Sequence, residues 1–290
     1  MFVAILRNDP TKETGSKWSE LAIADKPVGF LRKPLLSQFS GSMLILDGRP
    51  RYWRLSFFKG TAHTVDLFVA FHEEEPETKK DDLLVRGIWQ AIKGSGPDDQ
   101  EVRMASQWLR RSNSLTLDCY DQRADRWVCA DGAGLSMFTP TLQKPTFERA
   151  VVLLALSCAY QLRIEALVNE LAEWDNKLKS LDGLARTASE FNARCYFQHP
   201  VKLESTELPI IWDQIAERMR LDVLDEELMG QVNTLHALAS DLLRAKEQRR
   251  WNFIGSVLAV ISALQVFSLI PESVRDPWIY RMLSQLGWGG

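Results

Sequence analysis

Three polar side chains recur at three-residue intervals within an otherwise apolar stretch: Ser262, Gln265 and Ser268. In hydrocarbon, a hydroxyl or an amide needs a hydrogen-bond partner on a neighbouring helix or a contact with water. This polar line therefore has two interpretations. It either joins helices through hydrogen bonds or lines a narrow polar pore.

Residue types that usually perform catalysis or bind metals are scattered along the chain. The histidines and cysteines occur singly, without an HExxH or Cys-x-x-Cys pair: His63, His72, His199, His236, Cys119, Cys129, Cys158 and Cys195. No Gly-x-Ser-x-Gly elbow or phosphate-binding loop is present either. We therefore predict no catalytic residue, no metal site and no enzymatic activity, although a site assembled from residues far apart in the chain would leave no such motif. The sequence identifies no cofactor, and the separate thiols suit a reducing compartment.

The polar line lies within Phe253 to Ile270, which contains no charged residue. A hydrocarbon core about 30 Å thick needs roughly 20 mostly apolar helical residues to span it. Trp251 and Asn252 bring the stretch to that length, so we predict a transmembrane helix over residues 251–270. The alternative is a buried helix of a globular core, because the serines and the glutamine make the stretch only moderately apolar.

The flanks of this stretch predict its orientation. A basic collar precedes it, formed by Arg244, Lys246, Arg249 and Arg250. Because cytoplasmic flanks are enriched in Lys and Arg, we expect a single-pass membrane protein with residues 1–250 in the cytoplasm. The tail, residues 271–290, is expected to lie in the membrane interface, with these aromatic anchors: Trp251, Trp278, Tyr280 and Trp288.

Small residues also recur on one face of the predicted span, at Gly255, Ala259 and Ala263. A small residue every fourth position lets helix backbones approach closely in lipid. We therefore expect the spans of several copies to associate.

Before Pro145 the pattern is typical of a mixed α/β domain over residues 1–145, because short β-rich runs alternate with helical patterns. Two helices are predicted, Asp81–Lys93 and Glu101–Arg111, since each places its apolar residues on one face. Polar residues 121–125 predict a hairpin turn. Strands are predicted at Phe2–Leu6, Met43–Leu46, Tyr52–Phe58, Val65–Phe71, Leu115–Tyr120 and Arg126–Cys129.

After Pro145, apolar residues recur at spacings of three and four, which predicts long helices. One helix begins near Thr146 and ends before His199-Pro200, because proline cannot continue it. A second begins near Pro209 and runs without a breaker into the membrane. The fold class is therefore α+β, with a mixed domain followed by long antiparallel stalk helices over residues 146–250 and one C-terminal transmembrane helix.

In the second helix, residues Ile210–Arg250 would form a rod about 60 Å long. The helices carry more apolar positions than one partner covers, so we expect a homo-oligomer. The alternative is that the N-terminal domain covers the excess. Residues Ala150–Leu162 are apolar but too short to cross, and either enter the lipid or pack against the stalk. The excess apolar positions include Ile211, Trp212, Ile215, Met219 and Met229.

The composition limits the partners. The chain has 290 residues, of which 25% are charged and 46% hydrophobic, and a formal net charge of -3. This length allows one large or two medium domains. Because the basic collar is already explained by membrane orientation, we expect no nucleic-acid partner.

A cytoplasmic mixed domain, long leucine-seamed helices and a last helix that enters the membrane unbroken resemble the CorA-like divalent-cation transporter superfamily, over residues Thr146–Ile270. In that family, stalk helices surround a pentameric pore, the first membrane helix ends in a Gly-Met-Asn filter, and a second membrane helix follows. Here the corresponding position reads Leu269-Ile270-Pro271-Glu272, and the tail is too polar and too short for a second span. The resemblance therefore implies the scaffold, a long-helix oligomer, without the signature of cation transport.

Together these features predict a membrane-anchored homo-oligomer, CorA-like and with a pentamer among the options. Its N-terminal domain would sense an unknown cytoplasmic ligand or protein, and its stalk would pass that state to the membrane bundle as a channel or membrane-disrupting effector. The alternative is a static anchor or scaffold that holds a partner protein at the lipid bilayer. A membrane-tethered enzyme is the third hypothesis.

Overall fold

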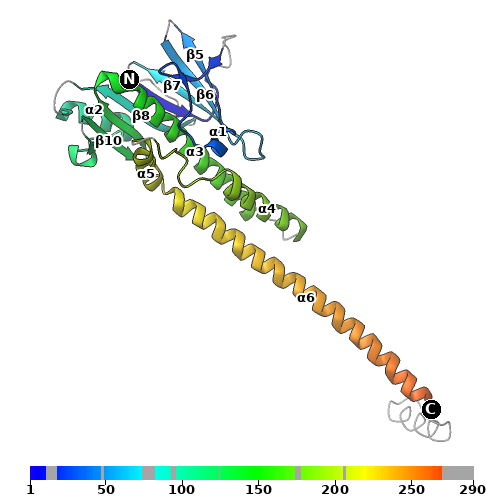
Figure 1. Cartoon of the computed structure of the whole chain (residues 1–290). Coiled ribbons are helices and arrows are strands. Elements are labelled where there is room, and N and C mark those ends of the chain that lie inside the picture. Colours follow the sequence, from blue (N-terminus) through cyan, green and yellow to red (C-terminus); the bar gives the residue numbers. More distant parts are fainter. Residues whose placement is uncertain are drawn as a thin grey trace. The chain divides into compact units, whose positions relative to one another are not determined.

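Nine strands of the described chain form one mixed sheet, in the order β2-β5-β6-β7-β1-β8-β11-β10-β9 (Figure 1). The computed structural model describes residues 1–10, 18–46, 49–73, 82–92, 96–123, 125–173, 178–204 and 207–269. Strands β8 and β11 pair in parallel, and the other neighbours pair antiparallel. The strands of the sheet are β1 Phe2–Leu6, β2 Ser19–Glu20, β5 Ser40–Leu46, β6 Arg49–Phe57, β7 Val65–His72, β8 Leu83–Ala91, β9 Asp121–Arg123, β10 Arg126–Asp131 and β11 Gly134–Thr139.

The chain divides into two compact units, Met1–Asn233 and Thr234–Gly290. The described elements outside the nine-stranded sheet are a short ladder and the helices. A small two-stranded ladder joins β3 Ala22–Ile23 to β4 Lys26–Pro27. The α-helices are α1 Lys33–Leu36, α2 Asp99–Arg110, α3 Lys144–Ala172, α4 Leu178–Arg194, α5 Leu208–Arg218 and α6 Leu221–Leu269, with 3-10 turns at Leu117–Cys119 and Thr141–Gln143.

The predicted α+β class is confirmed in its coarse form, a mixed domain built on a large sheet. Most predicted strands are confirmed with small shifts at their ends, as β1, β5, β6, β7 and β10. A hairpin is present at the predicted place, but residues 121–123 of the predicted turn form its first strand, β9, which pairs with β10. The strand predicted at Leu115–Tyr120 is wrong, because those residues contain a 3-10 turn. Strand β11, buried along its whole length, was not predicted.

The helix predicted at Asp81–Lys93 is also wrong, since these residues contain β8. Strand β8 lies between β1 and β11, and helices α2 and α3 pack against it. A strand buried on both faces carries apolar residues without strict alternation, so its pattern also satisfies a helical template. Contacts with neighbouring strands and helices therefore decide that this segment forms a strand.

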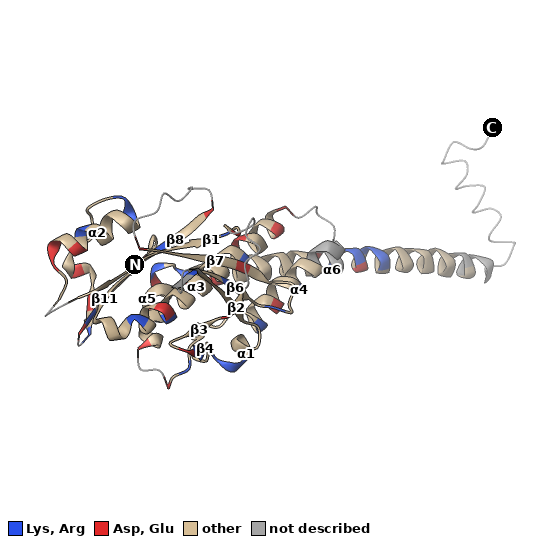
Figure 2. Cartoon of the chain, turned by 90° about the horizontal axis from the view of Figure 1, so that it is seen from above, with Lys and Arg blue, Asp and Glu red and all other residues tan. Residues whose placement is uncertain are grey.

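Helices α2 and α3 cover opposite faces of the sheet. Consecutive strand residues point to opposite faces, and in β1 the ring of Phe2 packs edge-on against Trp108 of α2. A Cβ added at Gly87 of β8 would meet both Val3 of β1 and Phe147 of α3 at 3.4 Å. Phe2 therefore faces α2 and Val3 faces α3, and the unit has three layers (Figure 2).

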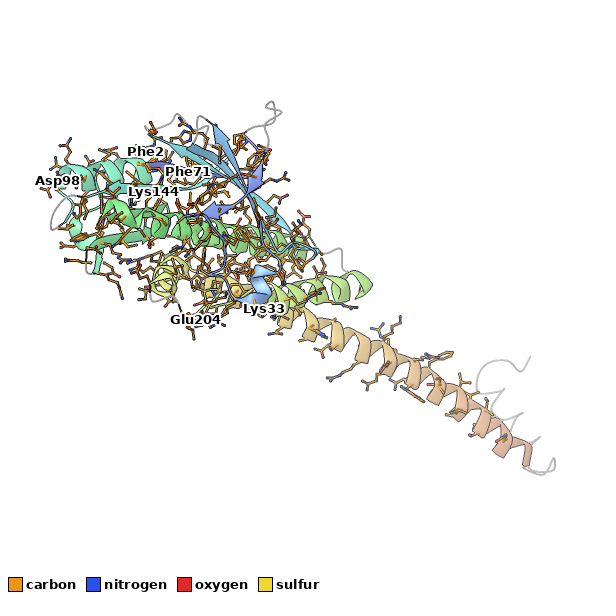
Figure 3. The ribbon with its side chains drawn as sticks, turned by 45° about the horizontal axis from the view of Figure 1, so that its top comes forward. Phe2, Lys33, Phe71, Asp98, Lys144 and Glu204 are labelled. Atoms are coloured by element: carbon orange, nitrogen blue, oxygen red, sulfur yellow. The ribbon has the colours of Figure 1, made fainter. Side chains whose placement is uncertain are left out.

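Helix α3 forms the centre of the core (Figure 3). Every residue from Ala150 to Tyr160 is buried. Such a helix is apolar on all sides because sheet and helices surround it. Of the two alternatives for residues 150–162, packing against the stalk holds in part, because the ring of Tyr160 contacts Trp212 of α5, a residue of the predicted rod. The sheet covers much of the remaining surface of α3 inside the first unit.

The uninterrupted helices predicted after Pro145 are wrong in two places. Helix α3 ends at Ala172, before α4 begins at Leu178. The predicted rod Ile210–Arg250 is broken because α5 ends at Arg218 and Arg220 adopts a left-handed conformation with φ 53°. Helix α6 then continues without a break from Leu221 to Leu269.

The apolar residues counted as excess on the second predicted helix are covered, most of them fully, inside the first unit. Ile211, Trp212, Ile215 and Met219 are buried, and Met229 is half-buried. The indole of Trp212 also donates a hydrogen bond to the Gln198 carbonyl at 2.7 Å. These side chains therefore give no reason to expect contacts between copies, and the homo-oligomer stays a prediction that depends on α6.

Candidate functional site

The last part of α6 exposes large apolar side chains. Trp251 and Phe253 are each 70% exposed, and the exposed set continues around the helix with Ile254, Val257, Leu258, Val260 and Ile261. Figure 2 shows this segment without charged residues, directly after a band of basic ones. In other proteins, exposed apolar areas of this size are surfaces that bind lipid or partner helices.

The basic collar lies on α6 immediately before this segment. Arg244, Lys246, Arg249 and Arg250 are all exposed, as is the anchor Trp251. A continuous helix therefore presents basic side chains followed by apolar ones, the order found where a helix leaves the cytoplasmic headgroup region. Outside the described residues lie Ile270 and the tail 271–290, with Trp278, Tyr280 and Trp288.

The two predicted stripes lie on α6 as the spacing requires. Gly255, Ala259 and Ala263 are exposed, and no atom lies within 4 Å of a Cβ added at Gly255. Ser262 and Gln265 are exposed as well. Ser268 lies in the same helix, but its side chain is outside the described part. The described members of both stripes therefore lie on an exposed helical surface.

A different helix is long and apolar enough to cross a membrane when judged by length and composition alone. Within the described residues this is Thr141–Ala172, whose most apolar window is 67% buried. Packing inside the first unit accounts for its composition, because core helices pass the same test. Its apolar character is therefore weak evidence for a membrane span.

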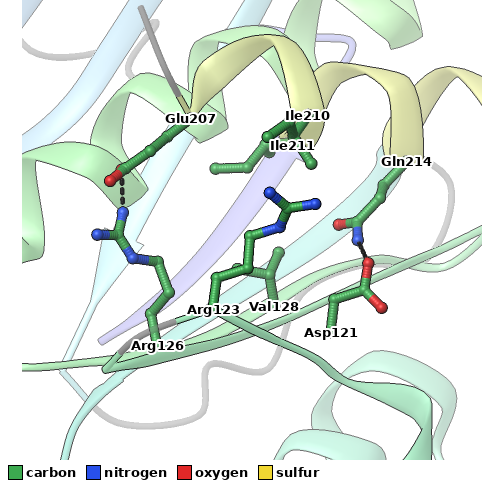
Figure 4. A pocket seen from close by; sticks show the side chains of 8 residues that line it. All are labelled: Asp121, Arg123, Arg126, Val128, Glu207, Ile210, Ile211 and Gln214. Atoms are coloured by element: carbon green, nitrogen blue, oxygen red, sulfur yellow. Dashed lines mark hydrogen bonds and ion pairs between the residues drawn. The ribbon is translucent and has the colours of Figure 1, made fainter.

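A second candidate site is a cavity of about 180 Å³ between the β9–β10 hairpin and α5 (Figure 4). Apolar side chains of β10 and α5, Val128, Ile210 and Ile211, line it together with charged and amide groups. The polar lining consists of Asp121, Arg123, Arg126, Glu207 and Gln214.

Two polar pairs bracket this cavity. The Arg126 guanidinium forms an ion pair with Glu207, and the Gln214 amide donates a hydrogen bond to Asp121. Figure 4 shows the Arg123 guanidinium between these two pairs. Arg123 is exposed, and its guanidinium makes no hydrogen bond or ion pair with any described residue.

Two buried polar atoms of the lining also lack a partner within the described part of the chain. They are Nε of Arg126, a donor, and Oε1 of Gln214, an acceptor. Buried polar atoms are nearly always satisfied in folded proteins, so unsatisfied ones in a cavity indicate a place for water or a ligand. The sequence did not reveal this site, because the hairpin and α5 are far apart in the chain and only the polar residues 121–125 mark it locally.

His63 is buried in the core and pairs with an arginine. Nδ1 of His63 accepts a hydrogen bond from Nε of Arg163 at 2.9 Å. Burial, reinforced by the positive charge of Arg163, lowers the pKa of His63. Neutral imidazole is therefore the form that this contact requires.

Cysteine thiols are free in the structure, and only Cys119 is exposed. Burial raises the pKa of Cys129 and of Cys158, each to about 12, which disfavours the reactive thiolate. Across the described ranges, no group of three or more His, Cys, Asp or Glu side chains is arranged to hold a metal ion.

Comparison with known proteins adds no family to this description. No protein-family model matches the chain, and no curated protein or solved structure does either.

Proposed function

We propose that this chain is a membrane-anchored homo-oligomer whose first unit binds a cytoplasmic ligand or partner and whose α6 helix passes that state to a bundle of membrane helices. The observation that supports the proposal is the exposed apolar part of α6. It is continuous in the described helix with the basic collar that would lie at the cytoplasmic surface.

The large apolar side chains that α6 exposes between Trp251 and Ile261 provide the free energy for membrane insertion. Removing a large apolar side chain from water contributes about 1.5–3 kcal/mol, so the exposed set as a whole corresponds to roughly 10 kcal/mol or more. Insertion of α6 into lipid removes these side chains from water, so each copy gains this free energy by itself. Contacts between helices in a bundle also remove part of this apolar surface from water, and they place Ser262 and Gln265 beside neighbouring helices.

A bundle of membrane helices would also determine which way the polar side chains of α6 point. With Gly255, Ala259 and Ala263 at the helix contacts, Ser262 and Gln265 would fall on the neighbouring face, toward the centre of the bundle. A ring of hydroxyl and amide groups at that position would line a narrow water-filled path. The CorA-like resemblance supports the same arrangement of helices, without a Gly-Met-Asn filter.

The test is ion flux through liposomes that contain the purified chain. We expect Gln265→Leu to reduce flux at least tenfold while cross-linking of copies persists, because the substitution removes the polar group and keeps the helix apolar. Ser256→Ala is the matched control. The Ser256 hydroxyl bonds to the Asn252 carbonyl of its own helix, so its loss should leave flux unchanged.

The remaining outcomes separate the alternatives. Membrane-bound oligomers that conduct no ion, with or without the first unit, would contradict the channel and support a static scaffold. A chain that stays in the aqueous phase in the presence of liposomes would contradict the whole proposal, since nothing would then solvate the exposed part of α6.

A further inference from the structure

We infer that the cavity between the β9–β10 hairpin and α5 binds a small organic carboxylate that also carries a hydroxyl or amine. The role of this molecule as the sensed ligand rests on the proposed membrane function, whereas its binding to the first unit does not. Three properties of the cavity define the ligand: the arginine without a described partner, the unsatisfied polar atoms and the size.

The lining has no net charge, because Asp121 and Glu207 balance Arg123 and Arg126, so the preference for an anion rests on the position of Arg123. Glu207 neutralises Arg126, and the Gln214 amide occupies one oxygen of Asp121. Arg123 is left as a cation without a partner among the described residues, and Figure 4 shows its guanidinium in the middle of the lining. A planar guanidinium fork matches the geometry of a carboxylate, which makes this the preferred anion.

The unsatisfied polar atoms define what else the ligand must carry. Nε of Arg126 is a buried donor without a partner in the described part of the chain, and it can bond to a ligand oxygen. Oε1 of Gln214 is likewise a buried acceptor without a described partner, and it needs a donor such as a hydroxyl or an amine. A buried polar atom left without a partner costs free energy, so a ligand that satisfies both atoms recovers it.

The size and the apolar lining set the body of the ligand. A water occupies about 30 Å³ in the liquid, so a cavity of about 180 Å³ holds roughly six water-sized groups. This is smaller than the pockets that hold drug-sized ligands. The side chains of Val128, Ile210 and Ile211 offer an apolar surface to a short hydrocarbon body or one ring.

The experiment measures binding by calorimetry on the full chain in detergent micelles, with 4-hydroxybenzoate as the probe. A ligand of about ten non-hydrogen atoms is expected to bind in the millimolar range or tighter. Its neutral counterpart 4-hydroxybenzamide should bind at least tenfold more weakly, because it lacks the charge that Arg123 attracts. Benzoate should bind more weakly as well, because it has no donor for Gln214.

Variants test the same assignment from the protein side. Arg123→Gln should weaken binding of 4-hydroxybenzoate at least tenfold, and Arg123→Lys should restore most of it. Arg103→Gln, which removes an exposed arginine on α2, is the matched control and should leave the affinity unchanged. Because the Arg123 guanidinium has no described partner to lose, its substitution should not unfold the chain.

The inference is overturned if the probe gives no binding at about 10 mM, well above the affinity expected for a ligand of this size. It is also overturned if the amide binds as tightly as the acid, or if Arg123→Gln binds as tightly as the unmodified chain. Flux without probe binding would remove this site and leave the membrane proposal standing. Binding without any flux would keep this site and contradict the channel.

Discussion

Gly134 occupies a backbone position that a side chain cannot enter. It begins β11 with φ 147°, and a Cβ placed on it would lie 1.8 Å from the Arg86 carbonyl oxygen of β8. The two strands pair in parallel at this point, so the contact is fixed by the sheet. A larger residue would have to separate the strands.

We therefore expect Gly134→Ala to reduce the free energy of unfolding by about 3 kcal/mol or more. Thermal denaturation of the full chain in detergent should show a decrease of roughly 5–10 °C. Gly132→Ala is the matched control, because no atom lies within 4 Å of a Cβ added there. Equal melting temperatures for the two variants would contradict the strand geometry described for β8 and β11.

A second residue-scale prediction concerns His63. Burial lowers its pKa first, and the charges of Arg163 and Arg194 act in the same direction, against the carboxylates of Glu190 and Glu170. The folded state thus binds a proton less readily than the unfolded chain, whose histidine pKa is about 6.5. Stability from the neutral histidine is complete above that pH, and it is lost as the pH falls below about 6.5 toward the lower folded pKa.

Replacing His63 by glutamine should therefore flatten the decrease in melting temperature between about pH 6.5 and 5, because the amide oxygen can still accept from Arg163 and does not titrate. Part of the slope should persist, since burial and Arg51 lower the pKa of His72 as well. His236→Gln, at an exposed position of α6, should leave the slope unchanged. A slope that His63→Gln does not alter would show that the histidine is not the titrating group.

At the scale of elements, the boundary between α5 and α6 depends on Arg220. This residue has φ 53°, in the left-handed region that a residue with a side chain adopts at a cost. The backbone N–H of Arg220 donates to the Glu217 carbonyl at 3.0 Å, and the carbonyl of Arg220 accepts from the Leu224 N–H. The backbone hydrogen bonds of the turn are therefore made, and its strain lies in the φ angle of Arg220.

Glycine at position 220 should accordingly raise the free energy of unfolding by about 0.5–1 kcal/mol, because it enters the left-handed region without a steric cost. Glu217→Gly, one turn earlier and inside α5, should lower it by about the same amount through the helix propensity of glycine. Denaturant unfolding of both variants should show these two opposite changes in the free energy of unfolding. If both substitutions destabilised the chain, α5 and α6 would be one continuous helix, as the sequence pattern alone suggests.

At the scale of the whole molecule, membrane attachment depends on the exposed apolar part of α6. Leu258 and Ile261 lie within it, and each is exposed. Replacing both by arginine places two charges inside the predicted span, at a cost of about 2.5–3.5 kcal/mol each near the centre of a membrane helix. We expect the double variant to be extracted by alkaline carbonate, whereas the unmodified chain stays in the membrane pellet.

The control carries the same charges elsewhere on α6. Val223 and Leu238 are exposed but precede the basic collar, so replacing both by arginine should leave the chain in the pellet. Membrane retention of the Leu258→Arg/Ile261→Arg variant would contradict the assignment of this segment as the span.

Local pattern alone predicted much of the first unit and the character of α6. Strands β1, β6 and β7 followed from runs of β-forming residues between turn signals, and the helix α2 followed from an amphipathic repeat. The sequence also predicted that one helix continues through Thr234 and that the stretch after Arg250 carries no charge. Both features could be predicted because helix periodicity and the absence of charge are properties of a single segment. The membrane function drawn from them stays a prediction.

The rest was decided by contacts between segments far apart in the chain. Strand β8 has a helical pattern and became a strand because β1 and β11 supply hydrogen bonds on both sides. Helix α3 is apolar on every side because the sheet and the other helices bury it. The cavity exists only where α5 folds back over the β9–β10 hairpin. Periodicity reports how one segment can divide polar from apolar faces, whereas the neighbour that covers each face is a property of the assembled chain.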